Sequence, residues 1–259
     1  MSNRFAIISD LHSNVEALTA VFQHLDAQGL TEILCLGDIV GYGPEPIPCI
    51  DKVMERCFLC LMGNHDEAVI HGAFGFNDHA RVAIEYTRRL LKPSLFNRAS
   101  KRRWQYLESL AKSYRHGPDL FFHASPREPT TEYILPLDAR GPGSPKLVAI
   151  FQMIDRLLFV GHTHLPGVIT EDFEFVAPEV LGNRYVIDGS KAIINVGSVG
   201  QPRDHNVDAC YVELDLDAED GLGVVIWHRV PYDYEATAKK IRDSGCLHER
   251  LALRLTEGR

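Results

Sequence analysis

The sequence predicts a single domain of the α/β class in which two β-sheets stack on each other. Short apolar runs alternate with helical patterns over residues 5–160, which is typical of a mostly parallel sheet. Closely spaced strand patterns follow over residues 168–230 and indicate a second, largely antiparallel sheet. The length of 259 residues suits one domain, residues 1–259, and no linker divides the chain.

The first three apolar runs each lead into a polar loop. A capping box at residues 13–16 and a proline-rich start near residue 46 mark the helices that follow the first two loops. Each loop is therefore expected at the end of a buried strand, where a rigid scaffold holds its side chains. The runs lie at residues 5–8, 33–36 and 57–61, and their loops carry Asp10 with His12, then Asp38, then Gly-Asn-His-Asp at residues 63–66.

Two amphipathic patterns, at residues 80–91 and 100–111, predict a helical insertion over residues 72–112 with a cap around residues 78–111. The insertion is the most basic part of the chain. A solvated helix face is the preferred interpretation, and a cap that attracts an anionic substrate is the alternative. Its cations are Arg88, Arg89, Arg98, Lys101, Arg102 and Arg103.

The remaining elements place histidines at two further strand ends. A run at residues 120–122 ends in His123, and a run at residues 157–160 ends in Gly-His-Thr-His, which contains His162 and His164. Between them, the proline-rich residues 125–144 predict a surface excursion that could act as a lid, followed by a helix from residue 145. A helix over residues 235–244 closes the fold, and we expect the last residues to be loosely held.

Composition narrows the class of protein. The net charge of -8 argues against sequence-independent binding to nucleic acid, because that binding depends on neutralising phosphates. Six scattered cysteines predict no disulfide framework, and the spacing of Cys57 and Cys60 within an apolar run favours core cysteines. With neither a signal-peptide core nor an apolar run long enough to cross a bilayer, the chain is expected in the cytoplasm with no membrane partner.

Five strand ends thus carry ligand-type side chains. The C-terminal ends of parallel strands share one edge of a sheet, so these side chains are expected to converge. Carboxylate, amide and imidazole donors suit Mn, Fe, Zn and related divalent ions. Seven ligands exceed the needs of one ion, and two ions sharing Asp38 could polarise a phosphoryl group and activate a water. The seven are Asp10, His12, Asp38, Asn64, His123, His162 and His164.

In this order and spacing, these motifs resemble the calcineurin-like metallophosphoesterases, and the match spans residues 5–164. The run at residues 195–204, Asn-Val-Gly-Ser-Val-Gly-Gln-Pro-Arg-Asp, is similar to a segment of the small bacterial and archaeal phosphodiesterase-like branch. The resemblance implies a four-layer αββα sandwich of two stacked mixed sheets. It also implies two divalent ions (Mn, Fe, Zn, Ni or Co), the first on Asp10, His12 and His164, the second on Asn64, His123 and His162, with Asp38 bridging.

The resemblance further implies roles in catalysis. His65 takes the family's place of proton donor and phosphate contact, and Asn64 also lies at the substrate. Arg203 either contacts a phosphate oxygen or pairs with Asp204 as a loop residue. Asp66 has no ligand role and is expected to cap the helix after it or to orient His65. Gly41 and Tyr42 stand where the Ser/Thr protein phosphatases have aspartate and arginine, which argues against a protein phosphatase and against the symmetrical dinucleotide hydrolase.

The expected function is hydrolysis of a phosphodiester, in a phosphorylated small molecule or nucleotide, by metal-activated hydroxide attack on phosphorus. The alternatives are hydrolysis of phosphomonoesters, phosphoproteins or dinucleoside polyphosphates, a nuclease activity, and a catalytically silent interaction scaffold, as occurs on this fold. The sequence leaves the physiological substrate and the oligomeric state open.

Overall fold

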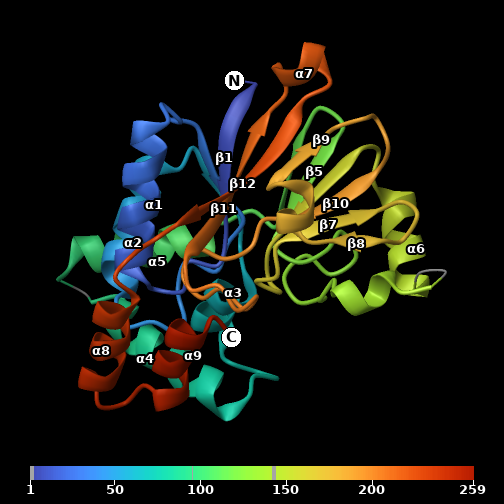
Figure 1. Cartoon of the computed structure of the whole chain (residues 1–259). Coiled ribbons are helices and arrows are strands. Elements are labelled where there is room, and N and C mark those ends of the chain that lie inside the picture. Colours follow the sequence, from blue (N-terminus) through green and yellow to red (C-terminus); the bar gives the residue numbers. More distant parts are fainter. Residues whose placement is uncertain (1–2, 95, 142–143) are drawn as a thin grey trace.

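A computed structural model describes residues 3–94, 96–141 and 144–259, apart from the side chains of residues 219 and 220. Two six-stranded sheets pack face to face between outer helices, so the fold has the four layers expected (Figure 1). Helices α1 (Val15–Ala27) and α2 (Pro46–Arg56) cover the first sheet, and α6 (Pro145–Met153) covers the second. The predicted fold class is confirmed.

The first sheet has the order β3-β2-β1-β11-β12-β9. Strands β1, β2 and β3 are parallel, and β11, β12 and β9 continue the sheet in antiparallel pairs. The strands are β1 (Arg4–Ile8), β2 (Ile33–Cys35), β3 (Leu59–Cys60), β9 (Arg184–Val186), β11 (Ala209–Asp215) and β12 (Val224–Val230).

The second sheet has the order β4-β5-β6-β10-β7-β8 and is mixed. Its centre, β5-β6-β10, is parallel, and the edges are antiparallel hairpins. The strands are β4 (Ser113–His116), β5 (Asp119–Phe122), β6 (Leu157–Val160), β7 (Gly167–Thr170), β8 (Phe175–Val176) and β10 (Ala192–Asn195).

Two expectations about the sheets were wrong. Strands β5 and β6 do not extend the first parallel sheet but form the middle of the second. The strands after residue 168 do not form a separate antiparallel sheet, because β9, β11 and β12 join the first sheet and β7, β8 and β10 join the second. A fully buried apolar run shows that a strand lies inside the protein, but not which sheet contains it.

The core between the sheets is apolar and tightly packed. Ile7 and Val212 of the first sheet face Phe121 and Phe159 of the second, and the two phenylalanine rings stack with centroids 4.8 Å apart. Trp227 donates an indole N–H bond of 2.9 Å to the Asn195 carbonyl, which links β12 to β10. This packing holds the ends of strands from both sheets in fixed positions.

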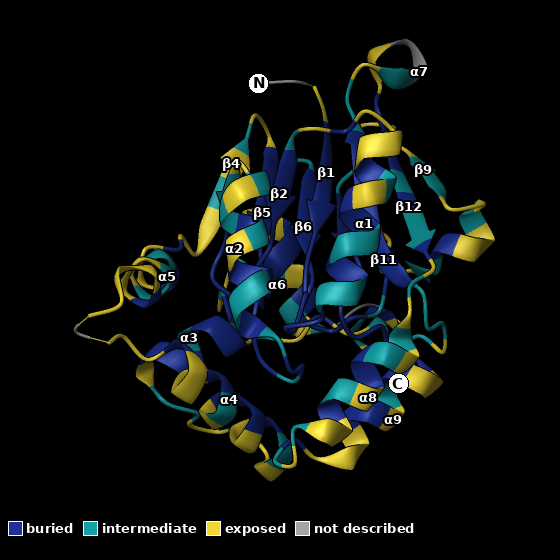
Figure 2. Ribbon diagram, turned by 90° about the vertical axis from the view of Figure 1, so that its left-hand side faces the viewer, coloured by how far each residue is buried: buried dark blue, intermediate teal, exposed yellow. Residues whose placement is uncertain are grey.

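Helices α3 (Asn64–His71), α4 (Asp78–Leu91) and α5 (Arg98–Glu108) lie together beside the first sheet (Figure 2). Several cations of this region pair locally: Arg103 forms a forked ion pair with Asp51 of α2, and Arg88 lies 6.0 Å from the Trp104 ring centroid. These contacts favour the solvated helix face over a cap that attracts substrate.

The excursion at residues 125–144 is partly buried, and residues 142 and 143 lie outside the described part of the chain. It contains the 3-10 helix η1 (Pro136–Ala139), with Ile134 and Ala139 in the core. Two shorter helices, η2 (Pro178–Leu181) and α7 (Ala218–Gly221), lie in connections between later strands.

The C-terminus is not loosely held, contrary to expectation: Gly258 is buried, and its carbonyl accepts a 2.8 Å bond from the His205 amide. The helix expected at residues 235–244 is also not the last one. After α8 (Tyr234–Asp243), a further helix, α9 (Glu249–Glu257), packs against α8 with Leu251, Ala252 and Leu255 buried. His248 caps α9 by accepting a 3.0 Å bond from the Arg250 amide. This helix places cationic side chains near the functional site described next.

Candidate metal centre

The seven expected ligands are brought together at the C-terminal ends of five strands. Three of these strands, β1, β2 and β3, belong to the first sheet, and β5 and β6 belong to the second. The site is therefore built where the edges of two sheets meet, and not along one sheet as expected. Asn64 is half-buried and the other six side chains are buried.

The backbone at these loops has an unusual conformation. Five of the seven residues have φ between 46° and 63°, in the left-handed region that non-glycine residues rarely occupy. Such conformations cluster at functional sites, where the surrounding structure holds them and aims their side chains. These residues are Asp10, His12, Asp38, His162 and His164.

The first group contains Asp10, His12 and His164. His12 Nδ1 lies 3.3 Å from the Val40 carbonyl and His164 Nδ1 lies 2.6 Å from the Gln201 carbonyl, so each Nδ1 carries the proton and donates it. The two Nε2 atoms are then unprotonated and lie 3.1 Å apart, so their lone pairs face each other. Two facing lone pairs repel, whereas a shared cation would accept both. Asp10 Oδ1 lies 3.2 Å from His164 Nε2 and has no hydrogen-bond partner.

The second group contains Asp38, Asn64, His123 and His162. His162 Nε2 lies 3.2 Å from the Thr131 carbonyl, so Nε2 carries the proton and Nδ1 has a free lone pair that can bind a metal ion. That Nδ1 lies 3.2 Å from His123 Nε2, which is also 3.2 Å from Asn64 Oδ1. Three potential ligand atoms therefore converge on one point, in the arrangement that a divalent ion requires.

Asp38 lies between the two groups. Its Oδ2 is 3.7 Å from His12 Nε2 and 3.5 Å from His123 Nε2. Its Oδ1 accepts a 2.8 Å bond from the His65 amide, which fixes the carboxylate. Gly63 is required here, because a Cβ at this position would collide with Asp38 Oδ1. One oxygen of Asp38 is thus directed toward both groups.

Electrostatics keep the imidazoles neutral. Burial is the main cause that lowers the pKa of His12, His123 and His164, and it lowers the pKa of His162 to about 3. Burial opposes ionisation of Asp10, but neighbouring histidines, His164 first, hold its pKa well below the usual range. Neutral imidazole and ionised carboxylate are the forms that bind metal ions.

His65 is held by ring contacts and by a glycine. Its ring centroid lies 4.3 Å from that of Tyr42, 4.9 Å from that of His12 and 5.1 Å from that of Phe76. Gly41, with φ of 92°, approaches so closely that a Cβ there would overlap the imidazole. Asp66 does not orient His65. It caps α3 by accepting from the Gly63 amide at 3.1 Å and also accepts from the amides of residues 39 and 40.

Of the two roles expected for Arg203, an ion pair with Asp204 is wrong, because Asp204 forms its ion pair with Arg229. Arg203 Nη2 instead donates a 3.0 Å bond to Gln201 Oε1. Arg254 of α9 was missed in the sequence, although its Nη1 donates to the same oxygen at 3.3 Å. Its only sequence signal is the apolar spacing of Leu251 and Leu255, which predicts a last helix.

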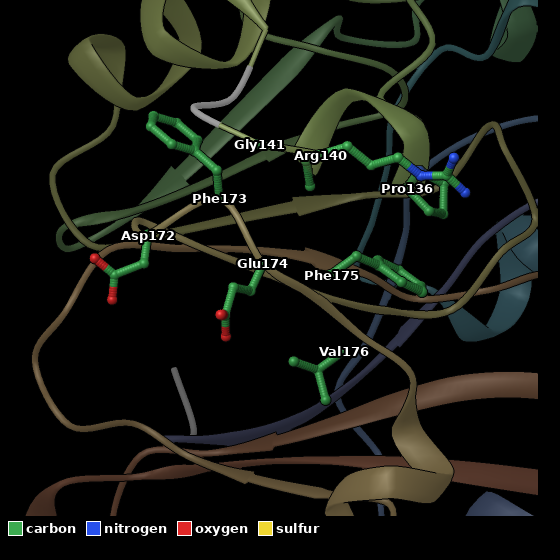
Figure 3. A pocket seen from close by; sticks show the side chains of 9 residues that line it. Pro136, Arg140, Gly141, Asp172, Phe173, Glu174, Phe175 and Val176 are labelled. Atoms are coloured by element: carbon green, nitrogen blue, oxygen red, sulfur yellow. The ribbon is translucent and has the colours of Figure 1, made fainter.

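A cavity of about 320 Å³ adjoins the second group. Asn64 and His162 form its floor, and aromatic side chains form its walls: Tyr133 stacks on His162 with centroids 4.0 Å apart, and Phe74 is 86% exposed. A larger cavity, of about 540 Å³, lies between η1 and the turn from β7 to β8 (Figure 3). None of the seven ligand-type residues lines it.

A family model for the calcineurin-like phosphoesterase superfamily domain matches residues 4–219. The chain belongs to this superfamily. It is 34% identical to the uncharacterized protein MJ0912 of Methanocaldococcus jannaschii, with all of both chains covered. The structure of a metallophosphoesterase from Sphaerobacter thermophilus is 36% identical, superposes with a TM-score of 0.79 and likewise covers all of both chains. This calcineurin-like phosphoesterase is therefore a metal-dependent phosphoester hydrolase.

The residues of the phosphoesterase fit divalent ions. The facing lone pairs of His12 and His164 and the unpartnered Oδ1 of Asp10 are explained by a bound cation.

Within the described residues, no helix is long and apolar enough to span a membrane.

Proposed function

We propose that this phosphoesterase is a dinuclear enzyme that hydrolyses phosphodiesters. The observation that carries the proposal is the position of Asp38 Oδ2 between two groups of donor atoms. Asp10, His12 and His164 would hold one ion, Asn64, His123 and His162 the other, and Asp38 both. When bound, two such ions polarise the phosphoryl group and activate a water for in-line attack.

His65 would stabilise the leaving oxygen by donating a hydrogen bond to it. Burial first, and Arg203 second, hold the pKa of His65 well below its usual range, so the ring is neutral and carries one N–H. An N–H aimed at the departing oxygen donates a hydrogen bond that strengthens as negative charge develops there. Its backbone bond to Asp38 ties the position of His65 to the metal ligands.

The aromatic cavity favours a diester over a monoester. A phosphodiester carries two organic groups, and a cavity of about 320 Å³ beside Asn64 and His162 gives the second group a binding place. Phe74, Phe76 and Tyr133 provide apolar faces on which an aryl or base ring can stack. A monoester would leave these faces exposed to water.

The donor set of nitrogen and oxygen atoms suits Mn, Fe, Zn, Ni or Co.

All six cysteines lie in the described part of the chain and are free, which supports the reducing compartment expected for a cytoplasmic protein.

The test measures bound metal and turnover of bis(p-nitrophenyl) phosphate in the wild type and in Asp38→Asn. We expect about two ions per wild-type chain, fewer than about one in the variant, and a loss of roughly 100-fold or more in kcat/KM. Asp51→Asn, which removes an exposed carboxylate from α2, is the matched control. Metal-dependent activity retained in Asp38→Asn would refute the mechanism, and faster turnover of p-nitrophenyl phosphate would make the enzyme a monoesterase.

A further inference from the structure

Two arginines from distant parts of the chain meet beside the metal centre. Arg203 lies in the loop between β10 and β11, and Arg254 lies on α9. Their guanidinium carbons lie 5.8 and 5.9 Å from the ring centroid of Tyr42. Two cations thus share one aromatic side chain.

These arginines have far more donors than acceptors. Each guanidinium carries five N–H groups, yet the acceptors near them are few and neutral: both donate to Gln201 Oε1, and Arg254 also bonds to the Tyr42 hydroxyl. Arg203 Nε is buried without a hydrogen-bond partner. Within the described residues, no carboxylate forms an ion pair with either arginine. Burial first, and the charge of Arg203 second, lower the pKa of Arg254, as expected for an uncompensated cation.

The pair lies one side chain away from the expected ligands. Gln201 links the arginines to a ligand-type residue. Its backbone carbonyl accepts from His164, and its side-chain amide oxygen accepts from the arginines. The Arg203 amide itself donates to the His164 carbonyl at 3.3 Å. On its other side, Tyr42 contacts the rings of His12 and His65. A group bound to the arginines would therefore be close to a phosphoryl group at the metal centre.

A cavity of about 330 Å³ opens at Arg254. Its lining includes Arg250, His79 and Tyr42, and its one carboxylate, Asp78, pairs with Arg81. Asn77 and Tyr42 also line the aromatic cavity. Tyr42 therefore lies between an aromatic cavity on one side and a cationic cavity on the other.

We infer that Arg203 and Arg254 bind a second phosphoryl group of the substrate, linked to the one that is cleaved. Guanidinium groups bind phosphate oxygens through paired, charge-assisted hydrogen bonds, and the unused donors of this pair, the buried Arg203 Nε among them, fit such a partner. The aromatic cavity would hold the base of the same molecule. The substrate class is then a nucleoside diphosphate or a longer nucleoside polyphosphate, cleaved at a phosphorus atom that carries two substituents, as the phosphorus of a diester does. This assignment rests on the proposed phosphoesterase function.

The test compares binding of α,β-methylene-ADP, whose phosphates cannot be separated by hydrolysis, with binding of AMP, by calorimetry on the manganese-loaded protein. We expect the wild type to bind α,β-methylene-ADP at least about tenfold more tightly than AMP. Arg254→Met should weaken the diphosphate analogue about 10- to 100-fold and AMP less than about threefold. Arg254→Lys should fall between, because lysine cannot donate as a fork.

Lys239→Met on α8, an exposed cation paired within its own helix, is the control and should change neither affinity. Equal wild-type affinities for the two nucleotides, or an equal loss for both in Arg254→Met, would overturn the inference. If Arg254→Met does not fold, Arg254→Lys takes its place: an unchanged ratio of the affinities for α,β-methylene-ADP and AMP in that variant would overturn the inference. The binding measurement does not depend on turnover. Lack of activity on aryl diesters would refute the proposed function, and the nucleotide affinities would still show whether the two arginines bind a second phosphoryl group.

Discussion

Replacing Gly41 by alanine tests how the fold holds His65. A Cβ at this position would lie 2.3 Å from Nδ1 of His65, whereas non-bonded heavy atoms rest about 3.4 Å apart, so the imidazole must move by roughly 1 Å. The backbone at φ of 92° adds a strain of about 1–3 kcal/mol. A misplacement of about 1 Å in a catalytic group can cost about 100-fold, so we expect kcat to fall roughly 10- to 100-fold.

The assay follows turnover of bis(p-nitrophenyl) phosphate together with metal content, which should stay at the wild-type level because the three atoms nearest to the added Cβ all belong to His65. Gly29→Ala is the matched control: its φ is 67°, and nothing lies within 4 Å of the added Cβ. That variant should lose about 1–2 kcal/mol of stability and keep its activity. Turnover of Gly41→Ala within twofold of the wild type would show that the position of His65 does not matter.

Three further outcomes are expected. His65→Ala should retain its metal ions and lose roughly 100- to 10,000-fold in kcat, and an unchanged rate would remove His65 from catalysis. Leu255→Ala should lower the free energy of unfolding by about 2–4 kcal/mol in urea titrations, because this side chain lies on the buried face of α9, whereas Leu253→Ala, at an exposed position of the same helix, should cost less than about 0.5 kcal/mol. In the metal-free protein, five buried histidines have lowered pKa values, so the unfolded chain binds more protons below about pH 6.5. Raised pKa values of Asp38 and Asp66 oppose this in part, and we expect stability to fall as pH drops from about 6.5 toward 4; a flat profile would contradict the assignment.

Local chemistry explains why so much of the site could be predicted. Asp10, Asp38 and His123 lie within three residues of the ends of short buried strands, and such loops are positioned by the strand before them. The helix cap at Asn14 and the proline at the start of α2 are also read from neighbouring residues. These signals require no knowledge of which strands pair.

The sequence by itself determined the family, the seven ligand-type residues and their order along the chain. The tertiary structure alone decided that two sheets share the site and that α9 brings Arg254 to Tyr42. The physical reason is that strand pairing and helix docking depend on contacts between residues far apart in the sequence, which an apolar pattern does not specify. His65 shows the same difference between sequence and structure. The Gly-Asn-His-Asp motif identified it in the sequence, and only the structure shows that Gly41, Tyr42 and Phe76 hold its ring.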